Sequence, residues 1–207
     1  MTTKLYALAL GLAGLAFGGG ATANTISLTP VVGNQFQHSV ESPCVFSSPS
    51  CQNPASFPSQ PLPSQGNVTN WDLLSPAYTG QTLLNVIGTG NTLRLGLNLN
   101  QTNANSPQTL VAFDMRVNDI IVDTFTGPVS VPDINNGLGF ADYLLGNFSS
   151  FSATDKVQFR FAFADANDGP EIVFVLGAPG TAVPEPATLA LLGLGLLGAC
   201  FARRRRS

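Results

Sequence analysis

Three segments of the chain alternate apolar and polar side chains with a period of two residues. Leucine occupies every second position from Leu93 to Leu99, and the same alternation runs through Val111–Asn118 and Val157–Ala164. Because successive side chains of a strand point to opposite faces, these segments are predicted to be strands with one buried face. Gly- and Asn-rich turn sequences separate them, and no long amphipathic helix pattern is present. We expect an all-β fold, an antiparallel β-sandwich of jelly-roll-like topology.

Shorter apolar segments complete the expected sandwich. Further strands are predicted at Ile26–Thr29, Thr82–Ile87, Ile120–Phe125 and Glu171–Leu176, and one short helix at Phe140–Leu145. Val111 should face inward with the alternating leucines and phenylalanines, and Trp71 should lie near the edge of the core. Asp168-Gly169 supplies turn chemistry between the last two strands, which predicts that Val157–Ala164 and Glu171–Leu176 pair as a hairpin.

The first 23 residues have the three parts of a secretory signal peptide. Lys4 precedes an apolar run from Leu5 to Phe17, and Ala21-Thr22-Ala23 supplies small residues for cleavage between Ala23 and Asn24. An uncleaved signal anchor is the alternative, although the small residues favour cleavage. We expect a protein that is exported across the inner membrane and whose mature chain begins at Asn24.

A second apolar run lies near the C-terminus, between a rigid segment and a cluster of arginines. The prolines of Val183-Pro184-Glu185-Pro186 cannot continue a helix or a central strand, so this segment is an extended tether. The uncharged run Ala187–Ala202 would reach about 24 Å as a helix, slightly less than a hydrocarbon core of about 30 Å. Arg203, Arg204, Arg205 and Arg206 would hold their end in the cytoplasm. The pattern predicts a transmembrane helix over residues 187–202, with everything before Val183 on the far side of the membrane.

These three parts, in this order, resemble the PEP-CTERM sorting signal, a tail that is also labelled an ice-binding protein C-terminal domain. The resemblance covers only residues 183–206 and rests on Pro184, Glu185 and Pro186, the Leu/Gly-rich run and the four arginines. It implies an exosortase as partner, a membrane cysteine transpeptidase that removes such tails, and a location at the cell surface or outside the cell. Nothing in the sequence supports ice binding, which usually needs arrays of regularly spaced threonines. A plain membrane anchor that is never cut is the alternative.

Between these two ends the chain divides by composition. Residues 24–66 are rich in proline, serine and glutamine and predict an irregular segment, whereas residues 67–181 carry the alternating patterns of the β-sandwich domain. Over residues 24–182, eleven acidic side chains stand against four basic ones. Such an acidic body disfavours nucleic acid and anionic lipid as partners.

The three cysteines fall into two groups. Cys44 and Cys51 enclose six residues in the exported part, where the compartment permits oxidation, and Cys200 lies in the second apolar run. We expect a Cys44–Cys51 disulfide that stabilises a local loop rather than the whole fold. Free thiols and a metal site are the alternatives. Because no second pair of ligands stands near these cysteines in the sequence, no metal is expected.

The sequence lacks the residues on which common catalytic centres depend. His38 is the only histidine and lies in the irregular segment, and no Gly-x-Ser-x-Gly motif is present. The G-x-G-x-x-G pattern at Gly193–Gly198 falls inside the apolar run, where glycines favour helix contact in a membrane rather than nucleotide binding. We therefore expect no enzyme and no cofactor.

An acidic segment, Asp165–Glu171, resembles the start of a calcium-binding loop. An EF-hand needs an acidic or amide ligand where Gly169 stands and a glycine where Pro170 stands, so a turn is the favoured interpretation. A weak Ca²⁺ site at Asp165 and Asp168 is the alternative, and a hydrolase that uses these two carboxylates is the least favoured hypothesis.

Charged residues on the polar strand faces offer the last candidate site. Arg94, Arg116 and Arg160 should project into solvent from three strands, with Asp114 close to Arg116. Cross-strand ion pairs, each contributing about 0.2–1 kcal/mol, are the simplest interpretation. A glycan-binding face is the alternative.

Two functions from different classes follow. The first is a non-catalytic cell-surface or extracellular-matrix protein associated with exopolysaccharide or biofilm, as the PEP-CTERM resemblance implies. The second is a carbohydrate-binding β-sandwich module whose face includes Trp71 and Tyr143, because sugar sites usually need aromatic rings for stacking.

Overall fold

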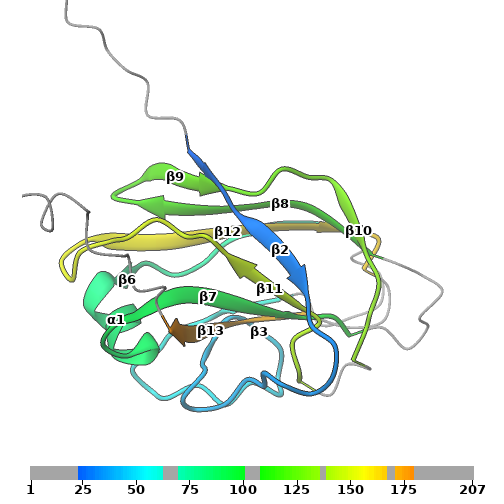
Figure 1. Ribbon diagram of the computed structural model, residues 1–207, viewed down its shortest axis with the longest axis horizontal. Coiled ribbons are helices and arrows are strands. Elements are labelled where there is room, and N and C mark those ends of the chain that lie inside the picture. The colour runs from blue at the N-terminus through cyan, green and yellow to red at the C-terminus, as the bar shows by residue number, and fades with distance from the viewer. Residues whose placement is uncertain (1–22, 63–69, 101–107, 136–138, 167–170, 180–207) are drawn as a thin grey trace, which may run out of the picture.

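In the residues that the structure describes, two β-sheets stack face to face and enclose the apolar core, with one short helix beside them (Figure 1). The computed structural model describes residues 23–62, 70–100, 108–135, 139–166 and 171–179 of the chain. The all-β class that the alternation predicts is confirmed.

Sheet A has seven strands in the order β1-β9-β8-β12-β5, with β10 paired to β8 and β6 paired to β12. Its strands are β1 (Asn24–Thr25), β5 (Trp71–Leu74), β6 (Tyr78–Thr79), β8 (Gln108–Val117), β9 (Ile120–Thr124), β10 (Val129–Val131) and β12 (Lys156–Ala164). Sheet B has six strands in the order β2-β11-β7-β13-β3-β4. Its strands are β2 (Ser27–Pro30), β3 (Cys44–Ser47), β4 (Gln60–Pro61), β7 (Asn91–Asn98), β11 (Tyr143–Gly146) and β13 (Ile172–Pro179).

Most strands pair antiparallel, as the sequence predicts. The pairs are antiparallel except at two sheet edges, where β1 runs parallel to β9 and β4 runs parallel to β3. Residues 24–61, which the sequence predicts to be largely irregular, supply β1 to sheet A and β2, β3 and β4 to sheet B. The Pro/Ser-rich segment therefore lies against the sandwich rather than apart from it.

The core between the sheets is built from the alternating leucines and phenylalanines. The buried side chains of β7 and β12 are Leu93, Leu95, Leu97, Val157, Phe159, Phe161 and Phe163. Phe46 of sheet B and Phe161 of sheet A meet across the interface with ring centroids 5.3 Å apart. Trp71 is 7% exposed and packs against Phe161 and Phe163. Aromatic packing of this kind stabilises the contact between the two sheets.

The predicted inward position of Val111 is wrong, because a β-bulge changes the phase of β8. Phe113 and Ala112 pair with Phe161 and Ala162, but the next residue of β12 pairs with Leu110, so Val111 is the extra residue. Leu110 is fully buried and Val111 is 40% exposed. A bulge reverses the inside–outside alternation at the point of insertion, and a pattern of apolar residues alone does not reveal it.

The strand predicted at Thr82–Ile87 is wrong, because Gly80–Ile87 forms the helix α1. Thr79 caps its start by accepting a hydrogen bond from the Thr82 backbone N–H at 3.2 Å, and Gly88 ends it with a φ of 80°. Leu83 and Ile87, four residues apart, bury one side of the helix. Local capping and this burial outweigh the preference of the β-branched residues for a strand.

The helix predicted at Phe140–Leu145 is also wrong. Tyr143–Gly146 forms β11, which pairs with β2 on one side and with β7 on the other. A segment with partners on both edges satisfies its backbone hydrogen bonds as a strand, whatever its local helix preference.

The hairpin predicted across Asp168-Gly169 is wrong, because β12 and β13 lie in different sheets. β12 pairs with β8 on one edge and with β5 and β6 on the other, and β13 pairs with β7 and β3. No free edge is left through which these two strands could pair. The connection crosses from sheet A to sheet B, and residues 167–170 lie outside the described residues.

The outer sides of the two sheets differ. On sheet B, a second apolar cluster joins the sheet residues Cys44, Leu144, Ile172, Phe174 and Leu176 to Val31, Phe36, Cys51 and Ala141 of neighbouring segments. We call this side the covered face. The outer side of sheet A, which we call the open face, carries Leu74 and Val111 at 40% exposure each, together with charged residues.

Candidate functional site

Four charged residues form a connected cluster on the open face. Arg160 donates to Asp72 through Nε at 2.7 Å and through Nη2 at 2.5 Å, and to Asp114 through Nη1 at 3.3 Å. Arg116 donates through Nε to the other Asp114 oxygen at 3.0 Å. The Arg160 hydrogen bond lowers the pKa of the Asp72 carboxyl. The Arg160–Asp114 pair is thus one of the expected cross-strand ion pairs, the Arg116–Asp114 pair lies within β8, and Asp72 of β5 extends the cluster.

Arg94 does not join this cluster. It lies on β7 of sheet B, whereas Arg116 and Arg160 lie on β8 and β12 of sheet A. The three arginines therefore do not line one face, since the sequence pattern does not say which sheet each strand enters.

The aromatic rings of the proposed glycan-binding face are buried. Trp71 turns inward against Phe161 and Phe163, and Tyr143 is 7% exposed and donates its hydroxyl to the Pro132 carbonyl at 3.1 Å. They also lie in different sheets. A shallow groove of about 350 Å³ does run over the open face beside Asp72 and Arg160, but the ring of Trp71 is not free for stacking there. The glycan face predicted around Trp71 and Tyr143 is wrong.

Cys44 and Cys51 are joined by a disulfide bond on the covered face. Asn53 holds the same loop independently of the sulfurs: its Oδ1 accepts the Cys44 N–H at 2.7 Å, and its Nδ2 donates to the Cys44 carbonyl at 2.8 Å and to the Phe57 carbonyl at 3.2 Å. An amide side chain therefore ties the Cys44 end of the loop to the segment that follows Cys51, in addition to the covalent bond.

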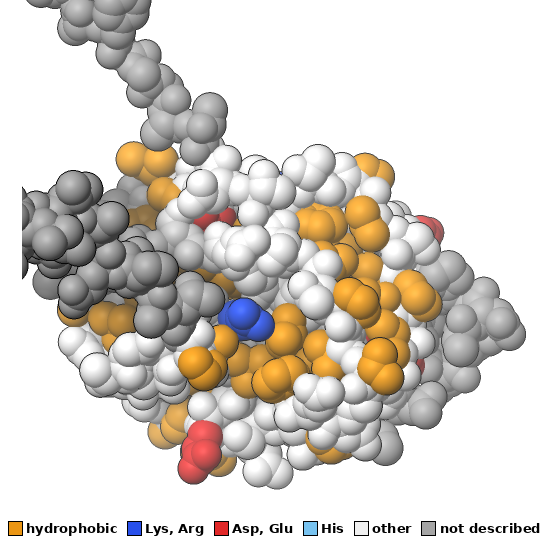
Figure 2. All heavy atoms as spheres, viewed as in Figure 1, with side chains coloured by type: hydrophobic (Ala, Val, Ile, Leu, Met, Phe, Trp, Pro, Cys, Tyr) orange, Lys and Arg blue, Asp and Glu red, His pale blue; other side chains and the backbone are white. Residues whose placement is uncertain are grey.

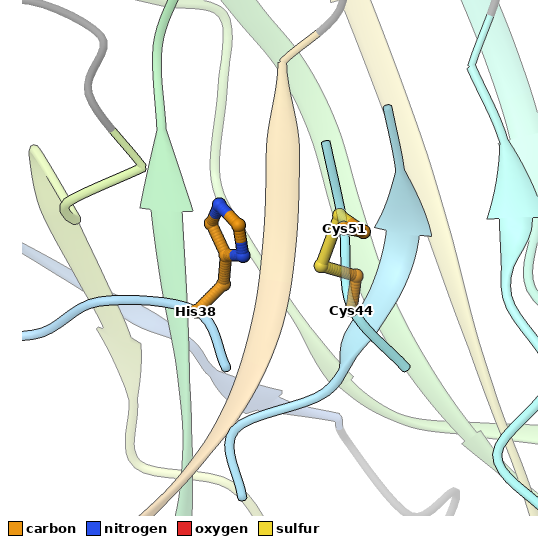
Figure 3. A group of neighbouring side chains, drawn as sticks. All are labelled: His38, Cys44 and Cys51. Atoms are coloured by element: carbon orange, nitrogen blue, oxygen red, sulfur yellow. A yellow bond between two sulfur atoms is a disulfide. The ribbon is translucent and has the colours of Figure 1, made fainter. Parts of the chain in front are cut away.

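His38 lies beside this disulfide, and the sequence does not predict this approach. One ligand atom each from His38, Cys44 and Cys51 lies within 4.8 Å of the others, and Figure 3 shows the imidazole next to strand β13 with a ring nitrogen turned toward the sulfurs. The His38 ring also meets Phe174 edge-on, with ring centroids 6.2 Å apart. The spacing His38-x5-Cys44-x6-Cys51 was the only signal in the sequence, and it fits no common metal-binding motif.

Asp142 is a buried carboxylate with a structural role. Its oxygens accept backbone N–H groups of Leu99 at 2.7 Å, Ile134 at 2.8 Å and Asn135 at 2.7 Å. Burial raises the pKa of Asp142 to about 6, against the three backbone donors, which lower it. Since both oxygens are engaged, this side chain fixes three segments rather than facing a substrate.

Glu171 is a buried carboxylate of the opposite kind. It is fully buried, and among the described residues neither its oxygens nor the side-chain atoms of the equally buried Gln108 have a well-formed hydrogen bond. Burial raises the pKa of Glu171 to about 8, so this group is mostly protonated at neutral pH. A neutral carboxylic acid avoids the large cost of a buried, unpaired charge.

The acidic loop is only partly described. Asp165 adopts a φ of 63° and accepts a hydrogen bond from the Thr109 hydroxyl at 3.0 Å. Asp168 and Gly169 lie outside the described residues, so the Ca²⁺ site at Asp165 and Asp168, and the hydrolase that would use the same pair, remain hypotheses.

The expected sorting and cleavage residues lie at or beyond the ends of the described chain. Asn24 begins β1, and its side chain donates to the Ser149 hydroxyl at 2.9 Å. Ala23 is described just before it, whereas residues 1–22, Pro184, Glu185, Pro186 and Arg203–Arg206 lie outside the described residues. In the described ranges no helix has the length and apolar character needed to cross a membrane, and residues 187–202 are not part of those ranges.

Charge is scattered over the surface that Figure 2 shows. On this face apolar side chains form patches separated by neutral polar surface, and acidic side chains occur only at isolated points. The acidic excess of the body therefore does not gather here into one strongly charged site.

Comparison with known proteins identifies one segment of the chain. Residues 182–206 match the family model described as the PEP-CTERM protein-sorting motif, which confirms the resemblance seen in the sequence. The motif implies export with membrane-associated sorting and processing by an exosortase. No curated protein and no solved structure matches the chain.

Proposed function

Since residues 182–206 carry a PEP-CTERM sorting motif, we propose that this is an exported, non-catalytic protein of the cell surface or extracellular matrix, associated with exopolysaccharide or biofilm. The motif match is the observation that carries the proposal. In it, the signal-peptide pattern of residues 1–23 directs export, the apolar run 187–202 tethers the chain, and an exosortase cuts near Pro184-Glu185-Pro186. The β-sandwich is then the part that remains outside the cell.

The use of the acidic side chains supports a non-catalytic role. General acid–base catalysis needs a carboxyl or imidazole within hydrogen-bonding reach of a substrate. Asp142 engages backbone N–H groups, Asp114 engages two arginines, and Asp123 accepts the N–H and hydroxyl of Ser149. Each of these buried carboxylates is occupied by the fold itself.

The charge of the body supports polysaccharide over nucleic acid as a matrix partner. Eleven acidic and four basic side chains over residues 24–182 repel a polyphosphate backbone. Neutral sugars carry no such penalty, and the polar surface between the apolar patches of Figure 2 suits hydrogen bonding to hydroxyl groups.

Intact-mass measurement of protein released from cells that contain an exosortase tests the sorting role. The expected species begins at Asn24 and lacks Arg203–Arg206. The matched variant replaces Pro184, Glu185 and Pro186 by alanine; it should keep its tail and stay with the membrane fraction. Recovery outside the cell of protein that retains the four arginines would contradict the proposal.

Co-sedimentation tests the matrix role separately. The released protein is mixed with extracellular polysaccharide from the same cells or with DNA, and only the polysaccharide should carry it into the pellet. Equal amounts in both pellets, or none in either, would leave sorting intact and reject the association with polysaccharide.

A further inference from the structure

Three potential metal ligands converge on the covered face, although their spacing in the sequence fits no common metal-binding motif. The ligand atoms of His38, Cys44 and Cys51 lie within 4.8 Å of one another, and the imidazole is turned toward the two sulfurs (Figure 3). In the sequence these cysteines have no second pair of ligands nearby. The fold supplies a third ligand by placing the His38 segment over strand β13.

The His38 side chain has an unused nitrogen at this place. Nδ1 is buried and has no hydrogen-bond partner within the part of the chain that the structure describes, and a buried polar atom without a partner costs free energy. Nε2 lies on the side of Gly139, where a Cβ atom would stand 2.6 Å from it. Burial lowers the pKa of His38, which favours the neutral imidazole, the form that binds metal ions. A disulfide alone does not need this ring, so its placement points to a further ligand.

The loop that carries the cysteines does not depend on the disulfide for its position. Asn53 bonds to both the N–H and the carbonyl of Cys44 and also to the carbonyl of Phe57. The Cα atoms of Cys44 and Cys51 lie 6.3 Å apart. Because none of these bonds involves a sulfur atom, we expect the two thiols to stay beside His38 in the dithiol form.

We propose that, before the Cys44–Cys51 disulfide forms, the two thiolates and the His38 imidazole bind one thiophilic d10 cation, Zn²⁺ or Cu⁺. Zinc binds Cys sulfur at about 2.3 Å and His nitrogen at about 2.0–2.1 Å, so tetrahedral ligand atoms lie roughly 3.5–3.8 Å apart. Once the S–S bond is open, the two sulfurs need to separate to that spacing, and the imidazole nitrogen, which lies within 4.8 Å of both, needs to approach by at most about 1 Å; rotation of the three side chains can supply both movements. Three protein ligands suit trigonal Cu⁺, or Zn²⁺ with one added water.

The metal-bound and disulfide forms exclude each other. Each cysteine is synthesised as a thiol, and binding of the cation releases two protons, one from each sulfur. When a disulfide-bonded oxidoreductase oxidises the site, the two thiolates give up two electrons as their S–S bond forms. These electrons and two protons from solvent convert the oxidoreductase's disulfide to two thiols, and the cation leaves. The site is thus a metal carrier in the newly exported, reduced protein and a covalent clip in the oxidised protein.

Cobalt(II) titration of the reduced, full-length protein tests the proposal. All variants carry Cys200→Ser, so that the third thiol does not contribute. After removal of a phosphine reductant under anaerobic conditions, one equivalent of Co²⁺ should produce thiolate-to-cobalt charge-transfer absorption. Cys44→Ser/Cys51→Ser and the oxidised protein should show none, and His38→Gln should bind at least about tenfold more weakly. Titration with Cu⁺ against a Cu⁺-specific chelator, alongside Zn²⁺ competition for the Co²⁺ signal, distinguishes the two ions.

Two results would overturn the proposal. One is the absence of a charge-transfer signal in the reduced protein, and the other is an unchanged affinity in His38→Gln. If the glutamine variant does not fold, alkylation of the Cys200→Ser protein decides instead. Bound Zn²⁺ should protect Cys44 and Cys51 together, and labelling at the metal-free rate would reject the site.

Discussion

The two outer faces of the sandwich are stabilised in different ways. The covered face of sheet B buries Phe174 and Cys44 under the segment that follows β2, and a disulfide joins the loop to β3. The open face of sheet A carries exposed apolar side chains and the Arg160 ion pairs, in which the Arg160 and Asp72 side chains are 34% and 54% exposed. Burial of apolar area contributes far more free energy than exposed charge pairs do.

The two faces therefore differ both in how much they stabilise the fold and in how much of their surface a partner can reach. Substitutions on the covered face should lower the free energy of unfolding by several kcal/mol, whereas those on the open face should lower it by less than about 1 kcal/mol. The open face, with its shallow groove, is therefore the side on which a partner can bind without disturbing the fold. The metal or disulfide site lies on the side where a small chemical change affects the packing.

The largest expected effect is at Phe174. Its ring is fully buried and occupies the space that a Cβ at Gly96 would need, 2.4 Å from the Phe174 Cζ atom. Phe174→Ala should lower the free energy of unfolding by about 3–5 kcal/mol through lost burial and a cavity. The matched open-face variant Val111→Ala should cost less than about 1 kcal/mol. Urea unfolding measures the free energy of unfolding of both variants. Equal losses in the two variants would contradict the claim that the two faces contribute differently to stability.

The buried Glu171 carboxyl should make the stability of the protein depend on pH. The unfolded Glu171 carboxyl titrates near 4.5 and the folded one near 8, so the folded protein binds the extra proton between these values. Stability from this group is therefore full below about pH 4.5 and falls as pH rises to about 8. The slope is about 1.4 kcal/mol per pH unit, or about 2–3 kcal/mol over two units. Glu171→Gln should flatten the slope and be more stable than the wild type at pH 8.

Unfolding curves at pH 5.5 and 7.5 decide this point. The free energy of unfolding of the wild type should fall over that interval relative to that of the glutamine variant. An equal change in both proteins would contradict a raised pKa at Glu171. Neither outer face contains the group, so Phe174→Ala and Val111→Ala should keep the wild-type pH dependence.

Removing the disulfide should have an intermediate effect. A closed loop of eight residues stabilises the folded state by about 2 kcal/mol in the chain-entropy model, so Cys44→Ser/Cys51→Ser should unfold at a lower urea concentration. Because Asn53 still holds the loop, both sheets should remain intact by circular dichroism. Reduction of the wild type should reproduce the loss, and both cysteines should resist alkylation until reductant is added. Immediate labelling of the native protein would show that the two thiols are not joined.

The smallest effect is expected on the open face. Arg160→Ala removes the hydrogen bonds to Asp72 and Asp114, while Arg116 keeps its bond to Asp114. The cost should be below about 1 kcal/mol and should shrink with added salt. A double-mutant cycle with Asp72→Ala isolates the pair. A coupling energy that is large and insensitive to salt would mean that this face is more tightly ordered than its exposure indicates.

Much of the sandwich could be predicted because strand patterns are local. The alternation in Leu93–Leu99 and in Val157–Ala164 fixes which side chains are buried. The errors came from non-local choices. The bulge at Val111, the separate sheets of β12 and β13, and the two paired edges of β11 depend on partners distant in sequence. The helix α1 depends on the cap at Thr79 and on burial of Leu83.

The candidate sites also divide into one that is continuous in the sequence and others that only the fold brings together. The sorting motif is a continuous segment, so the sequence alone reveals it, and the family match agrees. The approach of His38 to the cysteine pair, and the isolation of Glu171, arise only when the sheets stack. Residue spacing carries almost no information about either.

Transfer of the tail tests the sorting role of residues 182–206 most directly. An unrelated exported reporter, carrying its own signal peptide and residues 180–207 of this chain at its end, is expressed with and without an exosortase. The expected result is a reporter that is cut near Pro184-Glu185-Pro186 and reaches the cell surface only when the exosortase is present, whereas the β-sandwich without its tail does not arrive there. A reporter that is handled identically in both cells, or a tailless sandwich that still reaches the surface, would contradict the claim that this segment determines where the protein goes.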